Sequence, residues 1–396
     1  MDHAWSSLCV GFWLTACLAA MGAEYLRLPY AAALALVGLL AGLSGAAPGA
    51  APRAEAASEL LLPALLFYGA LRADISELQS EWKALALLAV PGLLVSVLVV
   101  GWCAHALLGV TLVWGLLLGA MLSLTDSVSA LRVLGVARAP ERLRTLLEGE
   151  SLLRAMAGAA LFAFLVGGMS EPDAAGPYAT LVRFGVSAGG GALVGLAMGA
   201  AVNRTLRRLD QPLLQTALTV VLAFGAPLVA DAASCSGPVA AVAAGLVAAN
   251  RGRFFAMTPR TYEALERSWE SAVLLVSALV FVAAGLGLRA GWSGGLWLKL
   301  AGVIALAPLA RALGVYPALR FGGRFGLEEV APAWRHALWW GGWQGAVSLA
   351  LALGLPADAP ERPLLMAACF GAVFLGALVQ GLGFRPVLRR LKIAEA

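Results

Sequence analysis

The sequence predicts an all-α polytopic membrane protein with about 13 transmembrane helices, and three observations support this fold class. First, 61% of the 396 residues are hydrophobic, only 13% are charged, and the mean hydropathy is +0.84. Soluble domains carry about 25% charged residues, so this chain has too few charges to cover a soluble surface. Second, apolar runs long enough to cross a bilayer recur along the chain. Third, basic residues collect in alternate loops.

The apolar runs divide the chain into thirteen predicted spans joined by short polar connections. A spanning helix needs roughly 20 mostly apolar residues, and the second, third and ninth runs are shorter than this. If the first six and the last six spans are repeats, they begin on opposite sides and form two inverted six-helix repeats. The spans are residues 8–26, 30–46, 57–72, 84–108, 111–134, 145–168, 179–202, 212–231, 234–249, 267–288, 294–318, 334–355 and 361–386.

The basic residues predict the orientation of these spans. The loops after odd-numbered spans, with the adjoining span ends and the C-terminal tail, hold 21 of the 28 basic residues, and the opposite side holds five. Lysine and arginine are enriched in cytoplasmic loops. We therefore expect the N-terminus outside the cell and the C-terminus in the cytoplasm.

Labelling of a cysteine placed at the C-terminus tests this orientation. We expect the Ala396→Cys variant, made after replacement of the five native cysteines, to react with a membrane-impermeant maleimide only after the cells are opened. The positive-inside rule is the physical reason, because the basic tail resists translocation. Labelling of intact cells from the outside would contradict the predicted orientation.

The sequence predicts no cofactor, no resident metal and no nucleic-acid partner. The five cysteines form no Cys-x-x-Cys pair, and the three histidines lie near the ends of spans. Because no metal-ligand or nucleophile–base spacing is present, a transporter is favoured over an enzyme. The net charge of +5 is explained by basic loops that act as topology signals.

Polar residues interrupt three predicted spans near the middle of the membrane. An ionisable residue at that depth is costly and is a candidate functional residue by default. Interrupted helices that meet at the midplane of inverted repeats are typical of secondary transporters. The alternative is that these groups only hydrogen-bond the helices together. The polar residues include Ser123, Thr125 and Asp126 in the fifth span, Glu148, Glu150, Ser151 and Arg154 in the sixth, and Gln344 among glycines in the twelfth.

Four segments resemble, in the same order, motifs of the NhaP/sodium–proton exchanger branch of the monovalent cation:proton antiporter superfamily. LLLPALLFYGALRADI (60–75) is similar to the family's LPPLLFEAG segment, and LTDSVSALRVLGVARAPERLRTLLEGESLL (124–153) to its TDPV…LLEGESL signature. SWESAVLLVSALVFVAAGL (268–286) resembles FWE…NSLVFLLIGL, and WGGWQGAVSLALALGLP (340–356) resembles WGGLRGAVSLALAL.

The resemblance implies an NhaA/NhaP-like fold in which the fifth and twelfth spans unwind and cross. The chain, residues 1–396, would be a single transmembrane transporter domain. A scaffold (approximately 1–82 and 179–290) would form a homodimer and flank a core (approximately 83–178 and 291–396). The core would move against the scaffold as an elevator in the plasma membrane.

The resemblance also implies the ion site. Asp126 is the retained carboxylate expected to bind the transported monovalent cation, with Thr125, Glu150 and Ser151 as retained neighbours. A cation 4 Å from one carboxylate gains roughly 4 kcal/mol at an effective dielectric constant near 20. Because a proton and a cation compete for such a group, one carboxylate suffices for exchange.

This sequence departs from the family at the site itself. The family motif ESLxND has an Asn-Asp pair that coordinates the ion and carries the proton, and Arg154 and Ala155 stand there. Tyr68 replaces the family's glutamate in the third span, Gln344 its arginine in the twelfth, and Ser127 the proline of TDP. The family's Asn-Asp positions thus hold no proton carrier, because arginine does not release its proton.

The departures change the expected charge of the site. The family pattern carries a formal charge of about −3, whereas Asp126, Glu150 and Arg154 sum to −1. Glu150 and Arg154 share a helix face at spacing i, i+4 and can form an ion pair. This pair would replace the one that Glu150 would otherwise make with the family's arginine in the twelfth span. Alternatively, Arg154 is a built-in cation that occupies the ion site or contacts an anionic substrate.

The predicted function is a secondary transporter, a sodium or potassium:proton antiporter. Its partners would be the cation, the proton, the lipid bilayer and a second copy of the chain. The alternative is a family member without cation exchange, which would be a binding or sensor protein or a carrier of another solute such as an anion.

Overall fold

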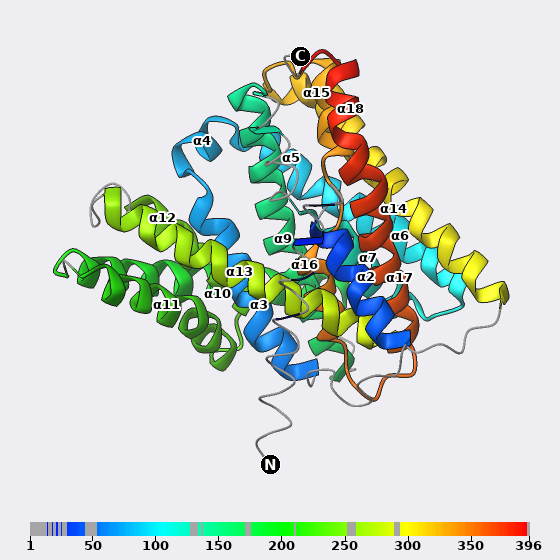
Figure 1. Ribbon diagram of the computed structural model, residues 1–396, viewed down its shortest axis with the longest axis horizontal. Coiled ribbons are helices and arrows are strands. Elements are labelled where there is room, and N and C mark those ends of the chain that lie inside the picture. The colour runs from blue at the N-terminus through cyan, green and yellow to red at the C-terminus, as the bar shows by residue number, and fades with distance from the viewer. Residues whose placement is uncertain are drawn as a thin grey trace.

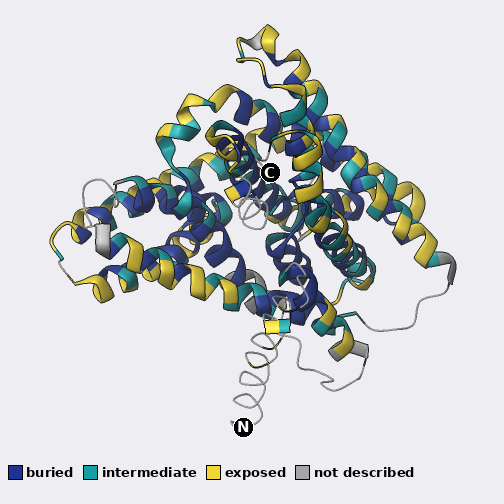
Figure 2. Cartoon of the chain, turned by 45° about the horizontal axis from the view of Figure 1, so that its top comes forward, coloured by how far each residue is buried: buried dark blue, intermediate teal, exposed yellow. Residues whose placement is uncertain are grey.

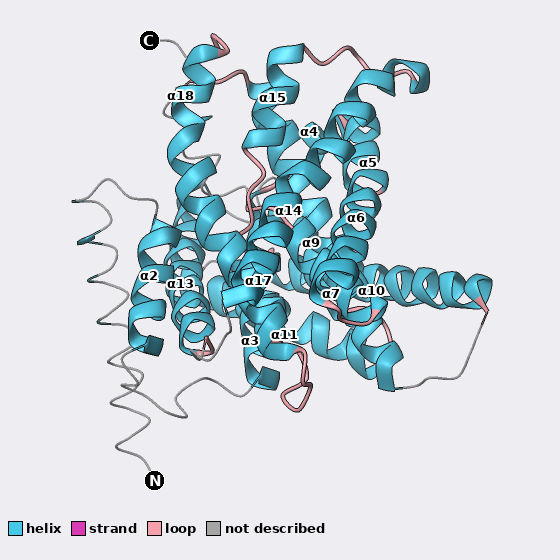
Figure 3. Ribbon diagram, turned by 90° about the vertical axis from the view of Figure 1, so that its right-hand side faces the viewer, coloured by secondary structure: helices cyan, strands magenta, loops and turns pink. Residues whose placement is uncertain are grey.

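The computed structural model describes residues 14, 18, 21–22, 25, 30–43, 54–126, 134–135, 138–170, 176–209, 211–251, 259–288 and 294–393. In this part of the chain the regular elements are helices, and Figures 1 and 3 show no strand there. The all-α prediction is therefore confirmed. Most of the first predicted span, residues 8–26, lies outside the described residues.

Helices follow one another along the described chain with short connections between them (Figure 1). They are α2 (Tyr30–Leu43), α3 (Ala54–Arg72), α4 (Ile75–Ser80), α5 (Trp82–Ala89), α6 (Pro91–Leu108), α7 (Leu112–Ser123), α9 (Glu141–Ser170), α10 (Pro177–Leu206), α11 (Pro212–Ala232), α12 (Gly237–Arg251), α13 (Pro259–Leu286), α14 (Gly294–Phe321), the 3-10 turn η2 (Gly322–Phe325), α15 (Pro332–Trp340), α16 (Ala346–Leu353), α17 (Arg362–Leu375), the π-helical η3 (Gly376–Gly381) and α18 (Leu382–Arg390).

Seven helical segments in the described residues are long and apolar enough to cross a membrane, and four shorter apolar helices accompany them. Each predicted span from the second onward overlaps helical residues, so the polytopic prediction is confirmed. The count of thirteen is not established, because the first span lies mostly outside the described residues.

The outer faces of these helices expose large apolar side chains. Leu98 and Trp102 on α6, Leu181 and Leu193 on α10, and Leu213 on α11 are each more than half exposed. Figure 2 shows the buried residues gathered in the interior and the exposed ones along the outer sides of the helices. Such surfaces are costly in water but suit contact with lipid chains.

The helices α10 and α12 pack with their backbones in close contact because glycines face the interface. A Cβ added at Gly191 would lie 2.3 Å from the Ser236 carbonyl oxygen, and one at Gly195 would lie 2.3 Å from that of Ala240. Small residues allow this close approach between membrane helices. The helices α3, α11 and α13 pack with this pair, whereas α6, α7 and α14 pack with one another, and Figure 1 shows α10 to α12 on one side of the molecule and α6 and α14 on the other.

The fifth and twelfth predicted spans are both interrupted. The helix α7 ends at Ser123, and residues 124–126 continue in a non-helical conformation. Residues 341–345 separate α15 from α16, and most of them have no regular structure. Both breaks agree with the sequence-based prediction, although Ser127 lies outside the described residues.

The two breaks cross and are hydrogen-bonded to each other. The Asp126 backbone N–H donates to the Trp343 carbonyl at 2.8 Å. The Gln344 side-chain amide donates to the Leu122 carbonyl, also at 2.8 Å. Gly345 is required at the crossing, because a Cβ there would lie 2.4 Å from the Asp126 Cβ. Within the membrane, the polar backbone groups freed by these breaks need partners, and these bonds supply them for the Asp126 N–H and for the carbonyls of Trp343 and Leu122.

Candidate functional site

A cavity lies beside the crossing of the two breaks. Its walls come from α2, α3, α9, α13 and α16 and from the non-helical residues after α7. It encloses an empty volume of about 1040 Å³, including space open to solvent. The hydroxyl and carboxyl side chains that line it are those of Tyr30, Tyr68, Thr125, Asp126, Glu148, Ser151, Glu270 and Ser277.

Three of the predicted site residues lie together in this cavity. Asp126 and Thr125 come from the break after α7, and Ser151 comes from α9. The Thr125 and Ser151 hydroxyl groups are 2.8 Å apart, so a hydrogen bond joins the break to α9. Both of these side chains are buried. Their oxygens are neutral ligands of the kind that hard cations prefer.

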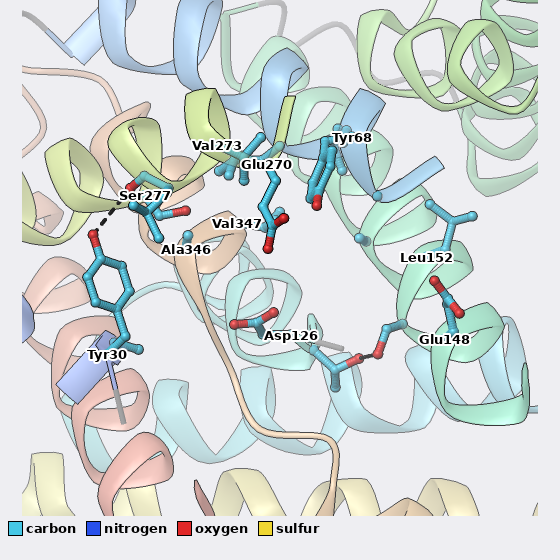
Figure 4. A pocket seen from close by; sticks show the side chains of 18 of the residues that line it. Tyr30, Tyr68, Asp126, Glu148, Leu152, Glu270, Val273, Ser277, Ala346 and Val347 are labelled. Carbon is cyan, nitrogen blue, oxygen red and sulfur yellow. Dashed lines mark hydrogen bonds between the residues drawn. The ribbon is translucent and has the colours of Figure 1, made fainter. Parts of the chain in front are cut away.

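Two further carboxylates line the cavity. The sequence placed Glu148 among the polar residues near mid-membrane but not in the predicted ion site, and it gave no indication of Glu270. Glu148 comes from α9, and Glu270 comes from α13 on the opposite wall (Figure 4). Helical spacing could have found Glu148, because it shares a face of α9 with Ser151 and Ala155 at i, i+3 and i+7. Among the described lining residues there is no lysine, arginine or histidine. The three carboxylates of Asp126, Glu148 and Glu270 favour a cation over an anion in this cavity.

Two of the five departures from the family pattern also line the cavity. Ala155 stands where the family has an aspartate, and Tyr68 stands where it has a glutamate. Arg154 and Gln344 are not among the lining residues. The amide of Gln344 instead holds the end of α7.

Arg154 points away from the cavity and into the packing of α6, α7 and α9. Its guanidinium group donates to the Ser123 carbonyl at 3.1 Å, to the Ser96 hydroxyl at 2.9 Å and to the Gly92 carbonyl at 3.3 Å. A fourth contact, at 3.3 Å, is the ion pair with Glu150 on its own helix. Arg154 is only 1% exposed.

Glu150 has a second arginine partner that the sequence did not predict. Arg311 on α14 lies 2.9 and 3.0 Å from the two carboxylate oxygens of Glu150. The Arg311 guanidinium also donates to the carbonyls of Leu338, at 2.9 Å, and Trp339, at 3.3 Å. Gly342 leaves room for it, because a Cβ there would lie 2.1 Å from the Arg311 Cζ.

Arg311 corrects the predicted charge of the site. The sequence predicted a single arginine partner for Glu150, namely Arg154 in place of the family's span-twelve arginine, and the predicted charge therefore included one arginine. With Arg311 included, Asp126, Glu150 and the two arginines sum to a formal charge of zero rather than −1, and the cavity carboxylates Glu148 and Glu270, which the predicted sum left out, add two negative charges. One signal was available, since Arg154 and Arg311 are the two arginines that lie deep within predicted spans.

Comparison with known proteins agrees with the fold and the motifs. The family model for the transmembrane sodium/hydrogen exchanger matches residues 13–390. The chain is 36% identical to the Na⁺/H⁺ antiporter NhaP of Pseudomonas aeruginosa over 349 residues, which cover 85% of this chain and 81% of the relative. It is 32% identical to ApNhaP of Aphanothece halophytica, with 95% and 72% covered, and 32% identical to NhaH of Halobacillus aidingensis, with 85% and 83% covered.

A solved structure shares the fold over almost the whole chain. The sodium proton antiporter MjNhaP1 from Methanocaldococcus jannaschii at pH 8 superposes with a TM-score of 0.82 at 21% sequence identity. The match covers 99% of this chain and 99% of that one. At this identity the likeness establishes the overall fold rather than the activity.

Proposed function

The chain belongs to the sodium/hydrogen exchanger family, and on that premise we propose that it is a secondary transporter that exchanges sodium for protons. The observation that carries the proposal is the cavity beside the crossed breaks. Three carboxylates, Asp126, Glu148 and Glu270, line it together with the Thr125 and Ser151 hydroxyl groups. The relatives from Pseudomonas aeruginosa and Halobacillus aidingensis are named as Na⁺/H⁺ antiporters, which supports sodium over potassium.

In this proposal Asp126 is the group that the cation and the proton share. Its side chain belongs to the break and lines the cavity, next to the hydroxyl oxygens of Thr125 and Ser151. The ionised carboxylate binds sodium, and the protonated carboxyl group releases it. The attraction between sodium and one carboxylate at 4 Å is roughly 4 kcal/mol at an effective dielectric constant near 20, enough to make binding depend on protonation.

We propose that transport uses an elevator movement of a core against a scaffold. The cavity supports this division, because α3 and α13 of the scaffold form one wall, and α9, α16 and the break after α7 form the other. Sliding of the core would carry the ion site from one side of the plasma membrane to the other. The scaffold would form a homodimer, with the N-terminus outside and the C-terminus in the cytoplasm.

The second candidate function is binding or sensing without exchange. It is favoured by Ala155 and Tyr68, which line the cavity without supplying the carboxylates of the family pattern. Reconstitution separates the two functions. In proteoliposomes with an internal pH dye, outward or inward gradients of sodium, potassium and lithium would be imposed in turn. The proposal predicts a sodium-driven pH change, and a silent dye with all three ions would support the second candidate.

Restoring the two missing carboxylates should strengthen sodium binding. We expect the double variant Ala155→Asp with Tyr68→Glu to lower the apparent KM for sodium by about tenfold or more, because both side chains line the cavity. Sodium-dependent dye responses in proteoliposomes measure this KM. The matched control, Ala155→Asn with Tyr68→Gln, has nearly the same shape without the charge. Equal KM values for the two double variants would contradict the expectation.

A further inference from the structure

The two arginines around Glu150 bind the carboxyl ends of the two interrupted helices. Arg154 donates to the carbonyl of Ser123, the last residue of α7. Arg311 donates to the carbonyls of Leu338 and Trp339 in the last turn of α15. The last four carbonyls of a helix lack partners within it and carry a partial negative charge. Each arginine therefore stabilises the end of one broken helix.

Glu150 connects these two ends. Its Oε1 atom lies 3.3 Å from Arg154 and 2.9 Å from Arg311, and its Oε2 atom accepts a hydrogen bond from Arg311 at 3.0 Å. All three side chains are at least 96% buried. The result is a continuous buried Arg–Glu–Arg chain that runs from the end of α7 through α9 to the end of α15. Buried charge pairs of this kind are costly to break once formed.

Arg154 also anchors this chain to α6. Its Nη2 atom donates to the Ser96 hydroxyl and to the Gly92 carbonyl. The Ser96 hydroxyl itself donates to the same Gly92 carbonyl at 2.8 Å. The guanidinium group thus makes four polar contacts within α6, α7 and α9. Arginine has five N–H groups, so its donors are nearly all engaged away from the cavity. This placement does not suit a built-in cation that occupies the ion site.

We propose that Arg154 is a positioning residue, which fixes the segment that carries Asp126 by tying the end of α7 to Glu150 and α6. Ser123 lies three residues before Asp126, and the Asp126 N–H is bonded to the other break through the Trp343 carbonyl. Loss of the contacts of Arg154 therefore loosens both breaks together. The part of this proposal that rests on the proposed function is the role of Asp126 in transport. The geometry that Arg154 imposes is measurable without transport.

Hydrogen–deuterium exchange of the purified full-length protein tests this assignment. In the Arg154→Met variant, which keeps the side-chain length but removes the donors, we expect backbone amides of residues 119–126 and 341–346 to exchange about tenfold faster or more. Peptides from α10 to α12 should be unchanged. Arg154→Lys keeps the charge and some of the donors, so its amides in these two segments should exchange more slowly than those of Arg154→Met. If Arg154 only filled space, the lysine and methionine variants would exchange at the same rate.

A second variant keeps every charge in place and covers the case in which Arg154→Met fails to fold. Ser96→Ala removes one acceptor of Arg154 and should speed exchange in the same two segments by about threefold. The matched control is Thr219→Val, at a site far from Arg154. Like the Ser96 hydroxyl, the buried Thr219 hydroxyl donates to a carbonyl of its own helix and accepts a hydrogen bond from another side chain, the indole N–H of Trp269. It should affect only α11 and α13.

The outcomes are distinct. Faster exchange in both breaks, with α10 to α12 unchanged, supports the positioning role. Faster exchange confined to α6 and α9, a uniform increase along the chain, or no change in either break overturns it. A protein that passes this test but moves no ions would contradict the proposed function and leave the role of Arg154 intact.

Discussion

Replacement of Asp126 by asparagine is expected to abolish sodium–proton exchange. The amide cannot bind a proton or balance the charge of sodium, and Asp126 is the carboxylate that the break itself presents to the cavity. Loss of an attraction of roughly 4 kcal/mol would weaken sodium binding about a thousandfold. Dye-based exchange in proteoliposomes made with Asp126→Asn measures this loss, together with a melting curve that shows the variant to be folded.

The control is a carboxylate-to-amide change outside the cavity. Glu263 on α13 is exposed and paired with Arg267 at 3.0 Å, and exposed pairs of this kind contribute about 1 kcal/mol or less. Glu263→Gln should therefore exchange sodium as the wild type does. If Asp126→Asn retained exchange near the wild-type rate, Asp126 would not be the shared group, and Glu148 and Glu270 would be the remaining carboxylates of the cavity.

Replacement of Glu150 by glutamine is expected to give the largest loss of stability. Glu150 is fully buried and forms ion pairs with both Arg154 and Arg311. Glu150→Gln therefore leaves two buried arginines without the carboxylate that balances their charge. Removal of one partner of a buried ion pair costs about 3 to 5 kcal/mol. Thermal unfolding of the purified protein in detergent should show a clearly lower melting temperature.

A double variant shows whether the charge is the cause. Glu150→Gln combined with Arg154→Met removes one of the two uncompensated cations, so it should recover part of the stability that Glu150→Gln loses. Such a coupling between contacting residues is what a double-mutant cycle measures. A melting temperature for Glu150→Gln equal to that of the wild type would contradict the account of the buried charge chain.

The sequence predicted the fold well because the membrane restricts the choices. A bilayer admits few structures other than helices, so long apolar runs indicate helices and their interruptions indicate breaks. Residues 341–345 contain three glycines, and the structure explains two of them by the close approach of Asp126 and Arg311. The crossing of the breaks followed from the resemblance and from the placement of polar residues at matching positions of the two halves.

The partners within the site could not be predicted as well. Spacing within one helix indicated the pair of Glu150 and Arg154, but Arg311 lies 161 residues after Glu150. Contacts over such distances depend on how helices rotate and pack, which one sequence does not reveal. The same holds for Glu270, whose placement opposite Asp126 depends on the position of α13 (Figure 4).

Competition between sodium and protons tests the central claim most directly. The apparent KM for sodium would be measured in proteoliposomes at a series of pH values, with the same pH on both sides at the start. If the two ions share Asp126, the KM should rise as the pH falls, by up to about tenfold per pH unit, while the maximal rate at saturating sodium changes little. A sodium KM that is independent of pH would contradict exchange through a shared carboxylate.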